Sequence, residues 1–179
     1  MRATFFRWAM GRMNTKIPSL LHRLMLQILL TVTARAFGQR GKIIWHLPAQ
    51  KGLRTYALYT LDCSQRSPQP ERLYDTFRSL GTFLRRLSGF TEDTDLGALV
   101  FFLYQVIGIT MEGSLPGKVQ VKRCFFSALY SPTQCALMSH MDAGLITGIL
   151  GRGSFRFTER LTEGYPTCTA FLLEEGNAK

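Results

Sequence analysis

Apolar positions recur at helical spacing over four stretches of the chain, and this pattern predicts four helices. The expected helices span residues 17 to about 37, 71–88, 96–109 and 133–150. The stretch 71–88 is the most regular, because one apolar stripe runs along it and most of its arginines lie outside that stripe. The run 96–109 is apolar almost all round, as a buried central helix would be.

Alternating apolar and polar positions predict strands, most of them near the C-terminus. The expected strands span residues 42–47, 118–122, 155–161 and 167–173, the last two joined as a hairpin. The fold class that follows is α+β, with N-terminal helices followed by a small antiparallel sheet in β-α-β-β order packed on helices. We divide the chain into a basic N-terminal helical segment, 1–41, and a single α+β domain, 42–179.

The glycines between residues 144 and 151 fall late in the last predicted helix. They resemble a phosphate-binding loop, but no strand precedes them and no Lys-Ser/Thr pair ends the motif. Close packing of this helix against another element explains them better.

Composition and charge narrow the partners. A chain of 179 residues that is 46% hydrophobic and 12% aromatic is long enough and apolar enough to fold around a core. Ten Lys or Arg and no acid lie in residues 1–61, whereas the rest of the chain carries twelve of each sign. The basic segment predicts contact with an anionic membrane surface or an acidic partner through residues 1–54, or simply a solvated helix face.

The sequence also bears on nucleic-acid binding and on the location of the protein. No recognition module or stacking motif accompanies the basic residues, so we expect no specific nucleic-acid partner. The apolar run 20–30 is interrupted by His22, Arg23 and Gln27 and is too short to span a bilayer. We expect a cytoplasmic protein, with peripheral attachment to a membrane as the alternative.

The four cysteines fit no known local metal motif. They are separated by 60, 10 and 32 residues, and the chain is too poor in cysteine for a disulfide scaffold, so reduced thiols are expected. Cys124, Cys135 and Cys168 could still converge in the fold and, with Asp142, hold zinc or iron. Buried cysteines that act as small apolar side chains are the more common alternative. We therefore expect no cofactor, with zinc or iron as the alternative.

Asp142 is the strongest candidate for chemistry. On a helix over 133–150 it shares one face with Cys135, seven residues earlier, and its companions there are mostly apolar. A carboxyl group in such surroundings needs a partner and often has a raised pKa, which suits acid or base catalysis. The alternative is that Asp142 bonds a neighbouring backbone amide. His140 lies about 140° around the helix from Cys135, which ranks it below Asp142.

Glu159 is a second candidate acid. In the alternation of Phe155, Phe157, Glu159 and Leu161 it occupies a position whose neighbours are expected to face the core. Two inward carboxylates on different elements could divide the roles of general acid and general base. The alternative is that a bulge or strand end turns Glu159 toward solvent or toward a neighbouring arginine, Arg156 or Arg160.

About 50 residues of the C-terminal third resemble the L-2-amino-thiazoline-4-carboxylic acid hydrolase-like family. The matching features are Cys124, Pro132, Cys135, Asp142, the segment FRFTERLTEG at 155–164, and Cys168. The resemblance implies hydrolysis of a C–N bond in a small cyclic amidine-like carboxylate. Asp142 would bind an amidinium or activate water, and Arg123 would pair with the substrate carboxylate.

The candidate site residues follow from these arguments together. The candidate catalytic residues are Asp142, Glu159 and Cys135, and the candidate substrate-binding residues are Arg123, Cys124, His140 and Cys168.

Two further resemblances point away from hydrolysis. The helix with Gly-Ile-Leu character and the Gly-x-x-x-Cys-x-x-Phe hairpin are similar to 4-vinyl reductase-type small-ligand domains. The spacing of the cysteines is similar to that of the plant carotenoid isomerase family. These resemblances imply a ligand sensor or an iron-assisted isomerase. The alternative function is therefore that of a non-enzymatic domain that binds a small ligand or a metal. The basic N-terminus could hold such a domain at a membrane surface.

Overall fold

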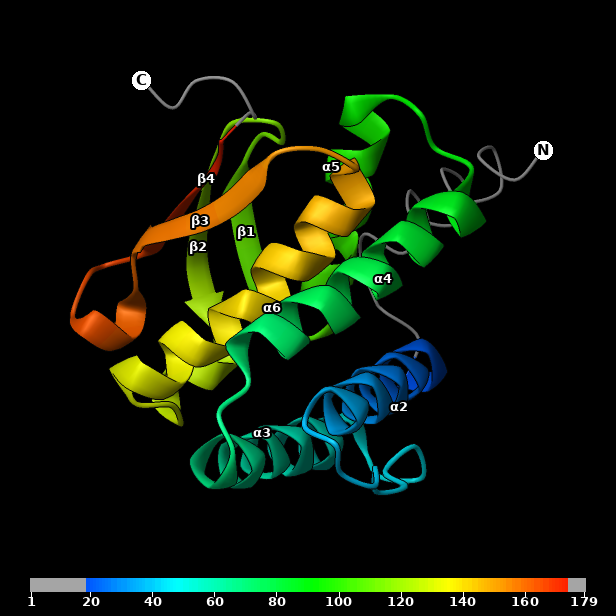
Figure 1. Cartoon of the computed structure of the whole chain (residues 1–179), viewed down its shortest axis with the longest axis vertical. Coiled ribbons are helices and arrows are strands. Elements are labelled where there is room, and N and C mark those ends of the chain that lie inside the picture. The colour runs from blue at the N-terminus through cyan, green and yellow to red at the C-terminus, as the bar shows by residue number, and fades with distance from the viewer. Residues whose placement is uncertain (1–18, 174–179) are drawn as a thin grey trace.

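The computed structural model describes residues 19–173 of the chain (Figure 1). This part holds five α-helices, four strands and two short 3₁₀ turns. In chain order they are α2 (Ser19–Ala36), α3 (Ala49–Arg66), α4 (Pro70–Ser88), α5 (Asp93–Val106), β1 (Ile109–Gly113), β2 (Lys118–Cys124), η1 (Phe125–Ala128), α6 (Pro132–Leu150), β3 (Ser154–Glu159), η2 (Leu161–Glu163) and β4 (Cys168–Leu173).

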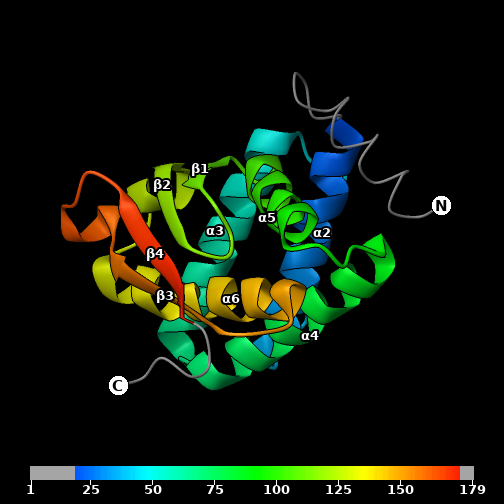
Figure 2. The same cartoon turned by 90° about the horizontal axis from the view of Figure 1, so that it is seen from above.

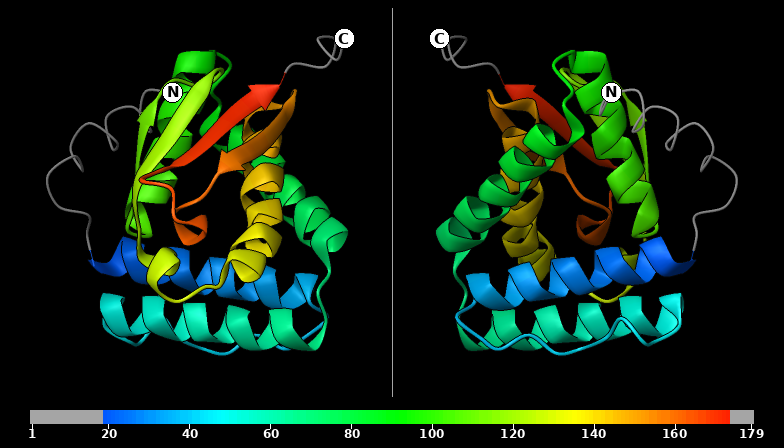
Figure 3. Two further views of the ribbon diagram at one scale, coloured as in Figure 1. Left: turned by 90° about the vertical axis from the view of Figure 1, so that its left-hand side faces the viewer. Right: turned by 90° about the vertical axis from the view of Figure 1, so that its right-hand side faces the viewer.

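The four strands form one antiparallel sheet in the spatial order β1-β2-β4-β3. Helix α6 connects one hairpin, β1–β2, to the other, β3–β4, so the chain order is β-β-α-β-β. Figure 2 shows the sheet on one side of the molecule, with α5 and α6 on its inner side. Figure 3 shows α2 and α3 side by side at one end, below the sheet and α6. The α+β prediction is confirmed, whereas the predicted order lacked one strand.

Four helix predictions are confirmed to within a few residues for the described part, but α3 was not predicted. Its buried face is built largely from small, aromatic and polar side chains, so it does not stand out as an aliphatic stripe. The buried residues of α3 are Gly52, Leu53, Tyr56, Ala57, Tyr59, Thr60, Cys63 and Ser64.

The strand predicted over 42–47 is wrong. The Gln27 side-chain oxygen accepts hydrogen bonds from the backbone N–H groups of Ile44 and Trp45, at 2.7 and 3.2 Å. The amide nitrogen of Gln27 donates to the Lys42 carbonyl at 3.1 Å. A side chain of α2 thus satisfies backbone groups that a neighbouring strand would otherwise pair, and the segment remains an irregular connection.

Strand β1 was also not predicted, because the expected central helix ran on to residue 109. The helix ends at Val106, and Gly108 adopts a φ of +77°, which L residues with side chains rarely adopt. The chain then enters the sheet at Ile109.

Helices α4 and α6 pack backbone against backbone. A methyl group at Gly144 would come within 2.2 Å of the Tyr74 carbonyl oxygen, and one at Gly148 within 2.2 Å of the Arg78 carbonyl oxygen. From the other side, a methyl group at Gly81 would lie 2.3 Å from the Leu145 carbonyl oxygen. Close helix packing is therefore confirmed as the role of Gly144 and Gly148.

Local signals define both ends of α6. Ser131 accepts a hydrogen bond from the Gln134 backbone N–H, and the Gln134 side chain accepts one from the Ser131 N–H, which together form a capping box. Pro132 occupies the first turn, and Gly151 ends the helix with a φ of +76°. The direction and length of α6 are thus set by residues within and beside it.

One hydrophobic core joins all of these elements, from Leu26 on α2 to Leu172 on β4. The division of the chain at residue 41 stays a prediction, and residues 1–18 lie outside the described part. Among residues 19–173, none of the helices combines the length and apolar character needed to cross a membrane.

Candidate functional site

A cavity of about 70 Å³ lies among α3, α6, the start of β1 and the segment that follows β2. Its walls are mainly aromatic, aliphatic and sulfur-containing side chains, and Asp142 is the acidic residue among those that line it. The lining residues are Tyr56, Ile107, Ile109, Cys124, Phe126, Tyr130, Cys135, Met138, Met141 and Asp142.

Aromatic rings form one wall of the cavity. The Phe126 ring stacks on the Tyr130 ring with centroids 5.5 Å apart, and it meets Tyr56 edge to face at 6.0 Å. The Tyr130 hydroxyl is hydrogen-bonded to the Thr60 hydroxyl of α3. The turn η1 thus places Phe126 in the cavity wall, in contact with both tyrosines.

Helices α2, α3 and α6 meet beside the cavity through a small polar cluster. The hydroxyls of Thr33 and Tyr56 are hydrogen-bonded at 3.1 Å, and the Tyr56 hydroxyl lies 3.6 Å from the Met141 sulfur. Because Tyr56 is 2% exposed, its hydroxyl depends on such partners. The cluster places Tyr56 and Met141 next to each other in the cavity wall.

The Asp142 carboxyl group is the polar centre of the cavity. Its Oδ1 atom accepts a hydrogen bond of 2.6 Å from the hydroxyl of Tyr104, which is buried on α5. Burial raises the pKa of Asp142 from 3.8 to about 6, although the Tyr104 hydrogen bond and the positive charge of Arg160 both act to lower it. At neutral pH the group is therefore mostly ionised, in a largely apolar wall.

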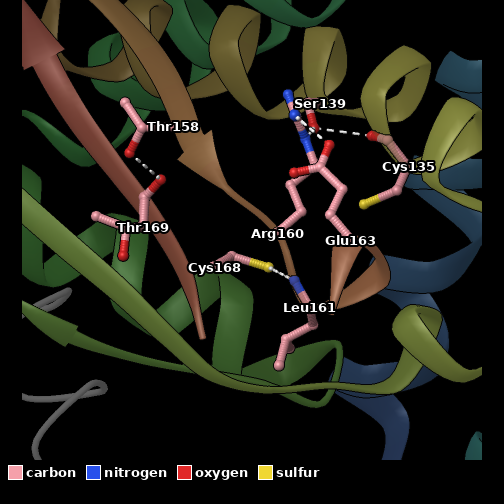
Figure 4. A network of polar contacts seen from close by, with 8 residues as sticks. All are labelled: Cys135, Ser139, Thr158, Arg160, Leu161, Glu163, Cys168 and Thr169. Atoms are coloured by element: carbon pink, nitrogen blue, oxygen red, sulfur yellow. Dashed lines mark hydrogen bonds and ion pairs between the residues drawn. The ribbon is translucent and has the colours of Figure 1, made fainter. Parts of the chain in front are cut away.

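The predicted convergence of three cysteines is partly seen. Cys124 and Cys135 line the cavity, and Cys168 is buried in β4, where its sulfur accepts a hydrogen bond from the Leu161 N–H at 3.3 Å (Figure 4). Burial raises the pKa of each of the three thiols, that of Cys124 to about 12. Protonated thiols are poor nucleophiles, so the raised pKa values disfavour nucleophilic attack by these cysteines.

The metal candidates Cys124, Cys135, Asp142 and Cys168 are not grouped as ligands. Within residues 19–173, no three or more His, Cys, Asp or Glu side chains are arranged to hold a metal ion. Zinc or iron binding by these residues stays a prediction.

Glu159 does not line the cavity. The register shifts between Phe157, which pairs with Ala170, and Glu159, which pairs with Thr169. Because Ala170 and Thr169 are neighbours in β4, they point to opposite faces of the sheet, and their partners do the same. The bulge therefore separates Glu159 from the core-facing Phe155 and Phe157, as the alternative interpretation of the sequence stated.

Three of the four predicted substrate-binding residues are also absent from the cavity lining. Arg123 is exposed on β2, His140 is exposed on α6, where it lines a different cleft, and Cys168 is buried in β4. The structure thus places Asp142, Cys124 and Cys135 at one cavity, and it does not add Glu159, Arg123, His140 or Cys168 to them. The catalytic and substrate-binding roles stay predictions.

The tyrosines at the site were missed by sequence reasoning. Tyr104 occurs in a helix that is otherwise almost wholly apolar, and a buried tyrosine hydroxyl usually needs a hydrogen-bond partner. That requirement could have identified Tyr104 as the neighbour of a buried polar group. No such signal identifies Tyr56, because α3 was not predicted, or Tyr130, which lies in the connection between η1 and α6.

Comparison with known proteins leaves the family open. No protein-family model and no curated protein matches the chain. Among solved structures, the chain is similar to a vinyl-4-reductase family protein from Methanocaldococcus jannaschii, with 13% sequence identity and a TM-score of 0.45 over 83% of this chain and 93% of that chain. The comparisons give the thiazoline hydrolase-like family no support.

Proposed function

We propose that the protein binds a small molecule in the cavity at Asp142. The ligand has a compact, mainly apolar body and one amidinium or ammonium group that pairs with the carboxylate. The observation that carries this proposal is an acid whose pKa burial raises to about 6, in a wall of aromatic, aliphatic and thiol groups. The lining offers no second ionised group at neutral pH, because the pKa values of its tyrosines and cysteines are raised.

The energetics favour a cationic ligand. Among residues 19–173, the hydrogen-bond donor found on the Asp142 carboxyl group is the Tyr104 hydroxyl, a neutral group. The positive charge of Arg160 stabilises the ionised carboxylate only in part, because no ion pair joins the two groups among the described residues and the largely apolar wall compensates the charge less than water would. A bound amidinium would supply charge and hydrogen bonds together, and it would lower the pKa of Asp142.

The size of the cavity limits the ligand. About 70 Å³ accommodates a molecule of only a few heavy atoms. Met138 and Met141 form part of the wall, and methionine side chains adapt their shape more readily than branched or aromatic ones. A somewhat larger ligand would therefore be admitted by movement of these two residues.

Binding without hydrolysis is favoured over the hydrolase hypothesis. A hydrolase of a cyclic amidine-like carboxylate needs a partner for the substrate carboxylate and a second acid or base. Arg123 and Glu159 were the candidates for these roles, and neither lines the cavity. Turnover of a thiazoline substrate that is lost in Asp142→Asn, with folding intact, would restore the hydrolase hypothesis.

A titration with acetamidinium, followed by NMR spectroscopy at pH 7.5, tests the binding proposal. Acetamide is the neutral control of nearly equal size. We expect acetamidinium to shift the resonances of cavity residues with a dissociation constant in the millimolar range, because a four-atom ligand has little binding energy. Acetamide should bind at least about tenfold more weakly.

The Asp142→Asn variant and a lower pH provide the controls. The variant should lose the preference for the cation, and so should the native protein at pH 5, where Asp142 is protonated. Equal binding of both probes, or shifts confined to the exposed surface, would contradict the proposal.

A further inference from the structure

A second cleft, of about 380 Å³, lies between α6 and the edge strand β3. It is separate from the Asp142 cavity, since the two share no lining residue. The residues that line it are Ala136, Ser139, His140, Ala143, Phe155, Arg156, Phe157 and Arg160.

The polar groups of this cleft are mainly hydrogen-bond donors. Arg156 and Arg160 contribute two guanidinium groups, His140 an imidazole and Ser139 a hydroxyl. No carboxylate is among the described residues that line the cleft. A concave surface with the ordered charge of Arg160, a second and exposed arginine beside it, and no acid in its wall attracts anions.

Arg160 is held in place by contacts on several sides (Figure 4). Its Nε donates to the Ser139 hydroxyl oxygen at 3.3 Å, and the Ser139 hydroxyl donates in turn to the Cys135 carbonyl at 2.8 Å. Its Nη1 pairs with Glu163 at 3.1 Å, and its guanidinium carbon lies 5.8 Å from the centre of the Phe157 ring. The side chain is 19% exposed, so this guanidinium group is ordered before any ligand arrives.

We propose that this cleft binds a small organic oxyanion, a phosphate or carboxylate joined to a flat apolar group. The guanidinium groups of Arg160 and Arg156 hold the oxyanion, since a planar guanidinium matches the oxygens of both anions. Phe157, which is only partly buried, contacts the apolar part of the ligand, and His140 supplies an additional donor at the exposed rim.

Glu163 gives the proposal a distinctive consequence. The Glu163 carboxylate forms a partly exposed ion pair with Nη1 of Arg160, so an incoming anion competes with Glu163 for this nitrogen. Removal of the Glu163 charge should therefore strengthen anion binding, although Glu163 does not line the cleft. A surface that attracted anions only through net charge would show the same small change for any acid that was removed.

The site shares no lining residue with the Asp142 cavity, and the Arg160 charge is only a minor influence on the pKa of Asp142. Helix α6 presents Ser139, His140 and Ala143 to this cleft and Met138, Met141 and Asp142 to the cavity. Failure of cation binding at Asp142 would leave anion binding at Arg160 untouched, and the reverse also holds.

Calorimetry on the full chain with phenyl phosphate, benzoate and benzyl alcohol at constant ionic strength tests the proposal. Phenyl phosphate and benzoate distinguish the two sources of the oxyanion, and benzyl alcohol is the neutral control. We expect one or both anions to bind at least about tenfold more tightly than the alcohol. Arg160→Gln and Arg156→Gln should each weaken binding about tenfold or more, and Glu163→Gln should strengthen it about threefold.

Two control variants separate this site from a general charge effect. Arg86→Gln removes an exposed arginine from α4 and should change the affinity by less than about twofold, because exposed charges at a distance are screened. Asp142→Asn should also bind the anions like the native protein. Arg156 is exposed, so Arg156→Gln should keep the native fold even if Arg160→Gln does not. Equal losses in Arg156→Gln and Arg86→Gln, or no binding of either anion, would overturn the proposal.

Discussion

The two sides of α6 differ in how closely they approach their neighbours. Toward α4 the helix presents Gly144 and Gly148, and the two backbones touch where side chains would otherwise lie. Toward α3 and the sheet it presents Met138, Met141 and Asp142, and a cavity of about 70 Å³ remains. The first side follows the usual dense packing of protein interiors, whereas the second does not.

The tight packing on one side of α6 explains how a cavity can persist on its other side. Empty space costs dispersion contacts, so surrounding elements tend to move inward and fill it. Helix α6 cannot shift in this way without losing its fit to α4, which places backbone atoms at contact distance. The tight side therefore holds the helix while the other side leaves room for a ligand.

The largest effect is expected from Gly144→Ala, which breaks the tight side. The added methyl group would meet the Tyr74 carbonyl oxygen at 2.2 Å, and backbone atoms cannot rotate away. We expect the free energy of unfolding to fall by about 4 kcal/mol, above the usual range for overpacking. Urea denaturation followed by circular dichroism measures this loss.

Gly52→Ala in α3 is the matched control. There the methyl group meets a methyl carbon of the flexible Leu26 side chain at 3.1 Å, and alanine favours the helix by about 1 kcal/mol. Its stability should remain within about 1 kcal/mol of the native protein. A loss as large as that of Gly144→Ala would show that close backbone contact is not what distinguishes the α4 side.

The next effect concerns the open side and the pH dependence of stability. Because burial raises the pKa of Asp142 from 3.8 to about 6, the folded protein binds this proton more tightly than the unfolded chain does. The contribution of Asp142 to stability is thus greatest below about pH 4 and is lost as the pH rises through about 6. The loss amounts to about 3 kcal/mol.

Comparison with Asp142→Asn isolates this contribution. We expect the unfolding free energy of the native protein, relative to that of the variant, to fall steadily between pH 4 and 6 and then to level off. Denaturant titrations at several pH values measure the difference. A difference that stayed constant, or that rose with pH, would mean that Asp142 is not in the poorly solvated environment that the cavity provides.

A smaller effect is expected from Tyr104→Phe, which removes the 2.6 Å hydrogen bond to Asp142. Since this bond favours the ionised form, its loss should raise the pKa of Asp142 by about one unit. Carboxyl carbon chemical shifts during a pH titration report the change. Tyr59→Phe, whose hydroxyl bonds the Arg40 carbonyl instead, should leave the pKa of Asp142 unchanged.

The smallest effect is expected from Arg160→Gln. The positive charge of Arg160 lowers the pKa of Asp142 less than the Tyr104 bond does, so its removal should raise that pKa by only a few tenths of a unit. Added salt should shrink the difference from the native protein, because screening already weakens the interaction. A pKa shift as large as that of Tyr104→Phe would contradict the expectation that the Tyr104 hydrogen bond lowers the pKa of Asp142 more than the Arg160 charge does.

Much of the fold could be predicted from local patterns. The apolar stripe of α4, the glycines of α6 and the shared face of Cys135 and Asp142 all follow from helical periodicity, and the structure contains each of them. Helix α3 and strand β1 were missed, because one has a mixed polar and aromatic buried face and the other follows a helix without any polar break.

Local sequence patterns specify which residues share a face within one element, since the periods of helices and strands are regular. Contacts between elements depend instead on how the whole chain packs. Tyr104 bonds Asp142, which lies 38 residues further along the chain. The Gln27 side chain of α2 accepts hydrogen bonds from the backbone N–H groups of residues 44 and 45. A bulge in β3 turns Glu159 away from the core. Such contacts depend on how whole elements pack, so no local period encodes them.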